Sequence, residues 1–184
     1  MNHLARLLTI GHSTLAADAF VAMLSAHRIE LLADVRRFPA SRRHPQFNCE
    51  ALAEMLARHD IAYQHFPELG GRREPNPDSI NTAWREAGFR GYADYMETAD
   101  FDHGITRLLE AAKSKATAIM CAEKSWRSCH RGLIADHVKA SGIEVIHILD
   151  AVATEPHPWT HAARMIDGRL SYSATRINQQ QLPF

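Results

Sequence analysis

The chemically richest part of the chain is the stretch from Ala116 to Val138, which reads ATAIMCAEKSWRSCHRGLIADHV. It carries two thiols, Cys121 and Cys129, and the second is followed directly by His130 and Arg131. A thiol beside cationic groups loses its proton readily, and the thiolate is the form that acts as a nucleophile or binds a metal. The stretch therefore predicts reactive thiol chemistry.

The local pattern around these thiols predicts a strand, a loop and a helix. The apolar run Ala116 to Met120 has the length of a buried strand, and apolar residues recur at helical spacing from Leu133 onward. Ser128 is a favourable N-cap residue, which would place residues 129–131 in the first helical turn. Free amides and the helix dipole at such a turn favour a phosphate or carboxylate. We therefore expect an anion site there, with Arg131 as a bidentate donor.

Strand-like and helix-like patterns alternate along most of the chain. The expected strands are 7–10, 31–35, 61–66, 116–120 and 144–149. This alternation predicts an α/β fold of three layers, α/β/α, with a mostly parallel sheet of about five strands. From Ala151 the alternation stops, and the Asp167-Gly168 turn predicts a C-terminal hairpin or edge extension. We expect a single domain over 1–184, with a core at about 8–150 and an extension at 151–184.

Polar residues follow each of the expected strands. In chain order they are His12 and Ser13, Asp34 and Arg36, Glu68 with Gly70 and Gly71, Cys121 and Glu123, and Asp150. In an open parallel sheet, ligands bind outside the carboxyl ends of the strands. Each residue alone is typical of a cap or turn, but together they predict a site at one edge of the sheet.

The basic residues are unusual in type, because only four of the 21 are lysines. Arginine binds carboxylates and phosphates through two parallel hydrogen bonds, although a GC-rich genome produces the same bias. The segment from Val35 to Asn48 holds four arginines and two phenylalanines and no acidic residue. Guanidinium groups and aromatic rings suit a nucleotide or a nucleic acid. The zero net charge argues against nonspecific binding of duplex DNA as the main activity.

Composition also bears on the cellular compartment. The apolar run before Gly11 is too short for a signal peptide, and no segment approaches the ~20 apolar residues of a membrane span. The three cysteines are an odd number, which is typical of a reduced protein without a structural disulfide. We therefore expect a cytoplasmic protein with no membrane partner, and the sequence predicts neither a cofactor nor an oligomeric state.

Several short motifs occur in an order that resembles a known bacterial family, the domain of unknown function number 488, or DUF488. The motifs are GHS at 11–13, DVR at 34–36, LGG at 69–71, GFRGYADYM at 88–96, CAE at 121–123 and CHR at 129–131. The resemblance extends from about Leu8 to Asp150, and the pieces PHPWT and DGRLSY resemble a tail seen in some members. It implies an α/β domain whose motif residues pool at one edge of the sheet, and it implies no particular reaction.

Our leading hypothesis is an enzyme that acts on a small anionic substrate, either phosphate-bearing or nucleotide-like. The candidate nucleophile, acid and base residues are Cys129, Asp34, Glu123 and His12. The candidate substrate-binding residues are Ser13, Arg36, Ser41, Gly70, Gly71, Arg90, Tyr92, His130 and Arg131.

Three alternatives remain open on the sequence alone. The first is a nucleic-acid-binding or DNA-repair accessory module in which residues 36–47 and the glycine-rich loop bind phosphates. The second is a zinc site on Cys121, Cys129 and His130, although Cys-x7-Cys-His is not a standard zinc spacing. The third is a redox pair of Cys121 and Cys129.

Overall fold

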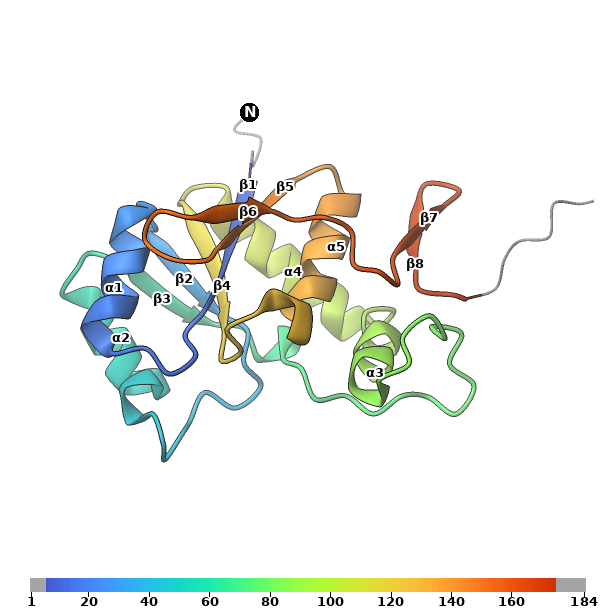
Figure 1. The fold of residues 1–184 in the computed structure, drawn as a ribbon, viewed down its shortest axis with the longest axis horizontal. Helices are drawn as coiled ribbons and strands as arrows, with labels where there is room; N and C mark the ends of the chain where they lie inside the picture. The colour runs from blue at the N-terminus through green and yellow to red at the C-terminus, as the bar shows by residue number, and fades with distance from the viewer. Residues whose placement is uncertain (1–5, 175–184) are drawn as a thin grey trace, which may run out of the picture.

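A computed structural model describes residues 6–174, and its central feature is a six-stranded sheet with the order β3-β2-β4-β1-β5-β6 (Figure 1). The strands are β1 (Arg6–Gly11), β2 (Leu31–Asp34), β3 (Ala62–His65), β4 (Thr117–Cys121), β5 (Glu144–Ile148) and β6 (Thr154–Pro156). The first five pair in parallel, and β6 pairs antiparallel with β5. The predicted parallel sheet is confirmed, and the extension adds an edge strand to it.

Helices cover both faces of this sheet, which confirms the three predicted layers. They are α1 (Ala17–Ala26), α2 (Cys49–Ala57), α3 (Ala87–Tyr95), α4 (Ala99–Ala112) and α5 (Arg131–Ala140). The buried side chains of α1 and α2 form one hydrophobic cluster with the sheet, and those of α3, α4 and α5 form another. In Figure 1, α1 and α2 lie together on one side of the strands. Within residues 6–174, no helix combines the length and the apolar character that crossing a membrane requires.

Strand β4 shows how the sheet directs the first thiol. Successive side chains of a strand point to opposite faces. Ala118 and Met120 accordingly join the cluster under α1 and α2, whereas Ile119 and Cys121 join the cluster under α3, α4 and α5. Cys121 therefore faces the helix that follows Cys129.

The predicted hairpin forms a separate two-stranded sheet, β7 (Arg164–Ile166) and β8 (Arg169–Ser171). Asp167 and Gly168 make its turn with φ values of 49° and 75°, as the tight turns of β-hairpins require. Tyr172, directly after β8, is buried in the cluster beneath α5. The extension is thus packed onto the core at both β6 and Tyr172.

The predicted start of the helix after β4 is wrong. A short 3₁₀ turn, Trp126–Ser128, intervenes, and its cap is Ser125, whose hydroxyl accepts from the Arg127 amide at 3.2 Å. Cys129 is extended, its amide donates to the Trp126 carbonyl, and α5 begins only at Arg131. The turn forms because the buried Trp126 ring stacks on His147 of β5, with centroids 4.4 Å apart. The expected row of three free amides at 129–131 is therefore absent.

Candidate thiol site

The loops after β1 and β4 lie against each other at the carboxyl edge of the sheet. The amide of His12 donates to the Cys121 carbonyl at 3.1 Å, and the amide of Ser13 donates to the Ala122 carbonyl at 2.8 Å. A Cβ atom on Gly11 would lie 2.0 Å from the Glu123 carbonyl oxygen, so only glycine fits this approach. Since β2 ends beside β4 in the same sense, the strand ends meet at one edge, as predicted.

A cleft of about 420 Å³ opens at this edge. Its buried wall includes Cys121, Cys129 and Arg36. Its exposed wall carries charges of both signs, which belong to Arg37, Arg72, Glu86 and Glu123. The aromatic side chains that line it are Phe38, Phe89 and Tyr92. The cleft therefore combines two thiols with arginines and aromatic rings.

His130 orients the thiol cluster. Its Nδ1 atom lies 3.9 Å from the Cys121 sulfur and 3.7 Å from the Cys129 sulfur. Its Nε2 atom lies 3.0 Å from the Val35 carbonyl oxygen, which can only accept a hydrogen bond. Nε2 therefore carries a proton whether the ring is neutral or charged, and Nδ1 is the ring nitrogen presented to both sulfur atoms.

Arg131 supplies a buried positive charge to the same cluster. Its guanidinium is within a side chain only 1% exposed, and Nε lies 3.4 Å from the Cys129 sulfur. Its other contacts are neutral: the carbonyls of Glu123 and Lys124 and the hydroxyl of Thr9. None of the ion pairs within residues 6–174 includes Arg131. Among the groups that it contacts in the described chain, Cys129 is the one that can carry the compensating negative charge.

These neighbours separate the pKa values of the two thiols. Burial alone would raise the pKa of Cys129, but the hydrogen bond from Cys121 and the charges of His130 and Arg131 lower that pKa well below its usual value. The hydrogen bond to Cys129 raises the pKa of Cys121 well above its usual value, and burial raises it further. The pair therefore favours a Cys129 thiolate that accepts from a protonated Cys121.

The same three side chains form a group that could hold a metal ion, since their ligand atoms all lie within 4.8 Å of one another. Two thiolates and an imidazole suit zinc. The buried guanidinium beside the Cys129 sulfur would repel a dication, however, because charges interact strongly away from water. The charge balance of the site favours the thiolate.

Comparison with known families agrees with the motifs. A family model described as "Domain of unknown function DUF488" matches residues 16–138, which is more than half of the 184 residues. The chain belongs to the DUF488 family. The match is shorter than the predicted 8–150 and ends before the C-terminal extension. No curated protein and no solved structure matches the chain.

Two DUF488 motifs, LGG and GFRGYADYM, provide walls for the thiol cluster. A Cβ atom on Gly71 would lie 2.8 Å from Nδ1 of His130, so the imidazole packs directly on the glycine. The Tyr92 ring lies 5.1 Å from the His130 ring, and its hydroxyl donates to the Leu69 carbonyl at 2.7 Å. Each motif thus helps to hold His130 in place.

We expect Gly71→Ala to displace His130 and to lower the free energy of unfolding by about 1–3 kcal/mol, the usual cost of overpacking. Urea denaturation measures this loss. Gly88→Ala is the matched control, because a Cβ atom there meets nothing within 4 Å and alanine favours the helix. Equal stability of the two variants would contradict the close packing of Gly71 on His130.

Two predicted catalytic residues of the DUF488 motifs are engaged away from the cleft. Asp34 is fully buried, and its carboxylate accepts from Arg36 through Nε and Nη2 and from the Tyr63 hydroxyl at 2.7 Å. His12 stacks on Phe47, and burial together with the Arg36 charge lowers its pKa to about 4. Neither side chain lines the cleft. The geometry gives them a role in orienting Arg36, which does line it.

The other predicted site residues divide into two groups. Seven of them line the cleft: Arg36, Gly71, Tyr92, Glu123, Cys129, His130 and, from the alternative metal set, Cys121. Ser13, Ser41, Gly70, Arg90 and Arg131 do not line it. Ser41 accepts from the His44 amide within its own loop, and the charge of Arg90 acts on Asp94.

Two arginines that line the cleft, Arg37 and Arg72, belong to the segments of the nucleic-acid alternative and were not among the substrate-binding residues of the leading hypothesis. Arg37 donates to the Arg72 carbonyl at 2.8 Å, and Arg72 has a φ of 61°, in the left-handed region. Both are exposed, so their charges face solvent and the cleft. The signal was present, because each directly follows a DUF488 motif, DVR or LGG.

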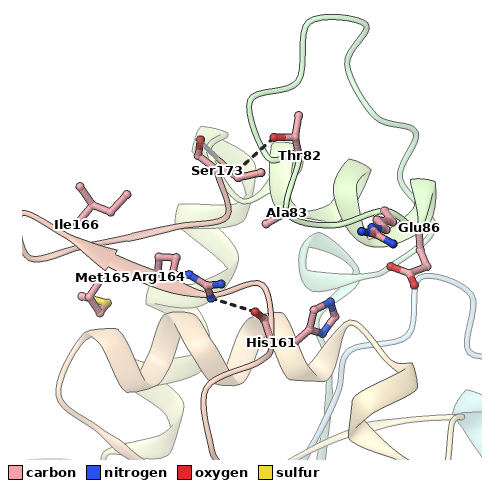
Figure 2. Close-up of a pocket in the computed structure, with 10 residues that line it drawn as sticks. Thr82, Ala83, Glu86, His161, Arg164, Met165, Ile166 and Ser173 are labelled. Atoms are coloured by element: carbon pink, nitrogen blue, oxygen red, sulfur yellow. Dashed lines mark hydrogen bonds between the residues drawn. The ribbon is translucent and has the colours of Figure 1, made fainter. Parts of the chain in front are cut away.

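A larger hollow of about 830 Å³ lies between residues 82–86 and the C-terminal hairpin (Figure 2). His161 and Arg164 line it, and Arg164 donates to the His161 carbonyl at 2.9 Å. No cysteine lines this hollow among the described residues, and its charged side chains are exposed. The candidate chemistry therefore belongs to the smaller cleft.

Proposed function

We propose that this DUF488 protein is an enzyme that acts on a small anionic substrate, with the Cys129 thiolate as its nucleophile. The observation that carries this proposal is the buried Cys129 sulfur between the Arg131 guanidinium, the Cys121 thiol and the His130 imidazole, on the wall of a cleft. A thiolate that is stabilised in this way at neutral pH is the reactive form in cysteine-dependent enzymes.

The proposed substrate class follows from the rest of the cleft. The exposed guanidinium groups of Arg37 and Arg72 are suited to a phosphate or carboxylate. The Phe38 and Phe89 rings offer faces on which a planar base could stack, which fits a nucleotide-like substrate. The proposal therefore keeps the anionic substrate but assigns its binding to Arg37 and Arg72 in place of Arg90 and Arg131.

The other cluster residues have proposed roles in proton transfer. His130 presents Nδ1 to both sulfur atoms, so it can take up a proton from the thiol pair and return it to a leaving group. Glu123 lines the cleft with an exposed carboxylate and is the proposed base for a second reactant such as water. Cys121 stays protonated in this proposal and donates its thiol hydrogen to the Cys129 sulfur.

Alkylation with a neutral and an anionic reagent tests both parts of the proposal. We expect iodoacetamide to label Cys129 faster than Cys49, with a pH midpoint below the free-cysteine value of ~8.5. We also expect the rate ratio of iodoacetate to iodoacetamide to be higher at Cys129 than at Cys49, because the arginines attract the carboxylate. Mass spectrometry of the labelled peptides measures both rates.

A pair of double variants isolates the arginines of the cleft. Arg37→Gln with Arg72→Gln should lower the iodoacetate rate at Cys129 about three- to tenfold and leave the iodoacetamide rate unchanged. Arg42→Gln with Arg43→Gln removes the same charge from exposed residues outside the cleft and should change neither rate. Equal labelling of Cys129 and Cys49 would contradict the nucleophile, and equal effects of the two double variants would contradict the anion site.

A dithiol redox function is the second candidate, supported by the two sulfur atoms within 4.8 Å of each other. Reversible loss of both thiols from the alkylation pattern after mild oxidation would favour it. The nucleic-acid or DNA-repair alternative has less support, because the Arg36 guanidinium is already paired with Asp34. Steeply salt-dependent binding of DNA or RNA would favour that alternative.

A further inference from the structure

A chain of buried polar residues lies behind Arg131. Asp136 lies 3.0 Å from Nε2 of His157, whose Nδ1 lies 2.8 Å from Nε2 of His147. Nδ1 of His147 lies 2.7 Å from the Thr9 hydroxyl, which lies 3.4 Å from Nη1 of Arg131. All five side chains are at most 3% exposed. The chain therefore connects Asp136 to the cation that contacts Cys129.

The hydrogen bonds of this chain have one consistent direction when both imidazoles are neutral. An ionised Asp136 only accepts, so His157 donates from Nε2 and its Nδ1 accepts from His147. Burial, together with the charges of Arg131 and Arg127, lowers the pKa of His147 to about 2, which keeps that ring neutral. Nδ1 of His147 then accepts from the Thr9 hydroxyl, whose oxygen accepts from Arg131. Every donor and acceptor along the chain is thereby satisfied.

The C-terminal extension supplies the far end of this chain. His157 follows β6, and its amide donates to the Val145 carbonyl of β5 at 2.8 Å. Thr160 donates to Asp136 from its amide and its hydroxyl, and Tyr172 donates to the same carboxylate. These three residues lie beyond the family match, which ends at residue 138. The extension is therefore bonded to the core at the fully buried carboxylate of Asp136.

We propose that the C-terminal extension is a working part of the thiol site: His157, through His147 and Thr9, holds the Arg131 guanidinium against Cys129 and so sets the reactivity of that thiol. The inference rests on the proposed role of Cys129 as the nucleophile. His157, His147 and Thr9 are positioning residues, because they act on Cys129 only through Arg131.

A purely structural role would give a different result. If the hydrogen-bonded chain only joined the extension to the core, breaking it would lower the stability of the protein. The labelling rate and the pH midpoint of Cys129 would then stay unchanged. If the chain orients Arg131, breaking it also slows the alkylation of Cys129 and raises its pH midpoint. The other titratable groups that face Cys129 are Cys121 from β4, His130 before α5 and Tyr92 from α3, and none of them is altered by this test.

The experiment measures iodoacetamide labelling of Cys129 against pH in the full chain. Thr9→Val removes the linking hydroxyl with little change of shape, and His157→Leu removes the link from the extension. We expect each variant to slow labelling at pH 7 by about fivefold or more and to raise the midpoint, because Arg131 loses an oriented acceptor. Thr9→Ser restores the hydroxyl and should label at close to the wild-type rate.

Two controls separate orientation from stability. His161→Leu makes the same substitution in the same extension, at an exposed residue outside the hydrogen-bonded chain from Asp136 to Arg131. Cys129 of this variant should be labelled at the wild-type rate. Tyr172→Phe removes one hydrogen bond to Asp136 and leaves the chain intact, so it should lower stability with a normal midpoint. Wild-type labelling in Thr9→Val, or an equal loss of rate in Tyr172→Phe, would overturn the inference. Slow labelling of wild-type Cys129 would instead contradict the proposed function itself.

Discussion

Replacing Arg131 with methionine is expected to lower the free energy of unfolding by about 3–5 kcal/mol, the usual cost of removing one partner of a buried charge pair. Methionine fills much of the same space but removes the hydrogen bonds that Arg131 donates to the Glu123 carbonyl and to the Cys129 sulfur. Removing the cation should also raise the pKa of Cys129, so that iodoacetamide labels it more slowly at neutral pH. Urea denaturation and labelling rates measure the two effects.

Two comparisons make this expectation specific. Arg127→Met removes an exposed arginine paired with Glu155 and should cost only about 0–1 kcal/mol. Adding Cys129→Ala to Arg131→Met should cost less than the sum of the two single substitutions, because neither charge is then left without its partner. Strict additivity of the two costs would show that Cys129 is not the counter-charge of Arg131.

Acidification from pH 7 to pH 5 is expected to lower the free energy of unfolding by about 2–4 kcal/mol, because two buried imidazoles stay neutral in the folded protein. The folded pKa values of His12 and His147 are about 4 and about 2, whereas an unfolded histidine has a value near 6.5. Below pH 6.5 the unfolded chain binds protons that the folded chain excludes. Stability is therefore complete above pH 6.5 and falls as the pH decreases toward 4.

Urea denaturation at pH 7 and pH 5 measures this loss, and variants assign it. His147→Gln should remove about half of the pH dependence, because glutamine does not titrate. His59→Gln changes an exposed histidine and should leave the dependence as it is in the wild type. Equal unfolding free energies at the two pH values would mean that both buried imidazoles bind protons without cost.

The sheet was predictable because its signals are local. The apolar run at 116–120 corresponds to β4 within one residue, and polar residues directly after such runs must lie at the carboxyl edge of a parallel sheet. The convergence of His12, Asp34 and Cys121 at this edge follows from the strand directions alone. No knowledge of side-chain packing was needed for that part of the fold.

The orientation of the side chains was not predictable, because contacts distant in sequence decide it. Ser125 and Ser128 are equally good caps, and the stacking of Trp126 on His147 selects the first. Position at a strand end does not say whether a carboxylate faces the cleft or is paired beneath it, as Asp34 is with Arg36. The hydrogen-bonded chain behind Arg131 was likewise not predictable. Its members are far apart in the sequence, since Thr9 contacts His147 and His147 contacts His157.

The place of β1 in the sheet has a consequence for biosynthesis. This first strand lies between β4 and β5, so its two partners begin more than 100 residues later in the chain. A nascent polypeptide cannot complete the middle of the sheet until β5 has left the ribosome. Folds with such distant pairings form slowly compared with those built on local contacts. Cys121 and Cys129 therefore emerge before β5, the strand that completes the sheet around β1, and their thiols are accessible to reagents until that strand is in place.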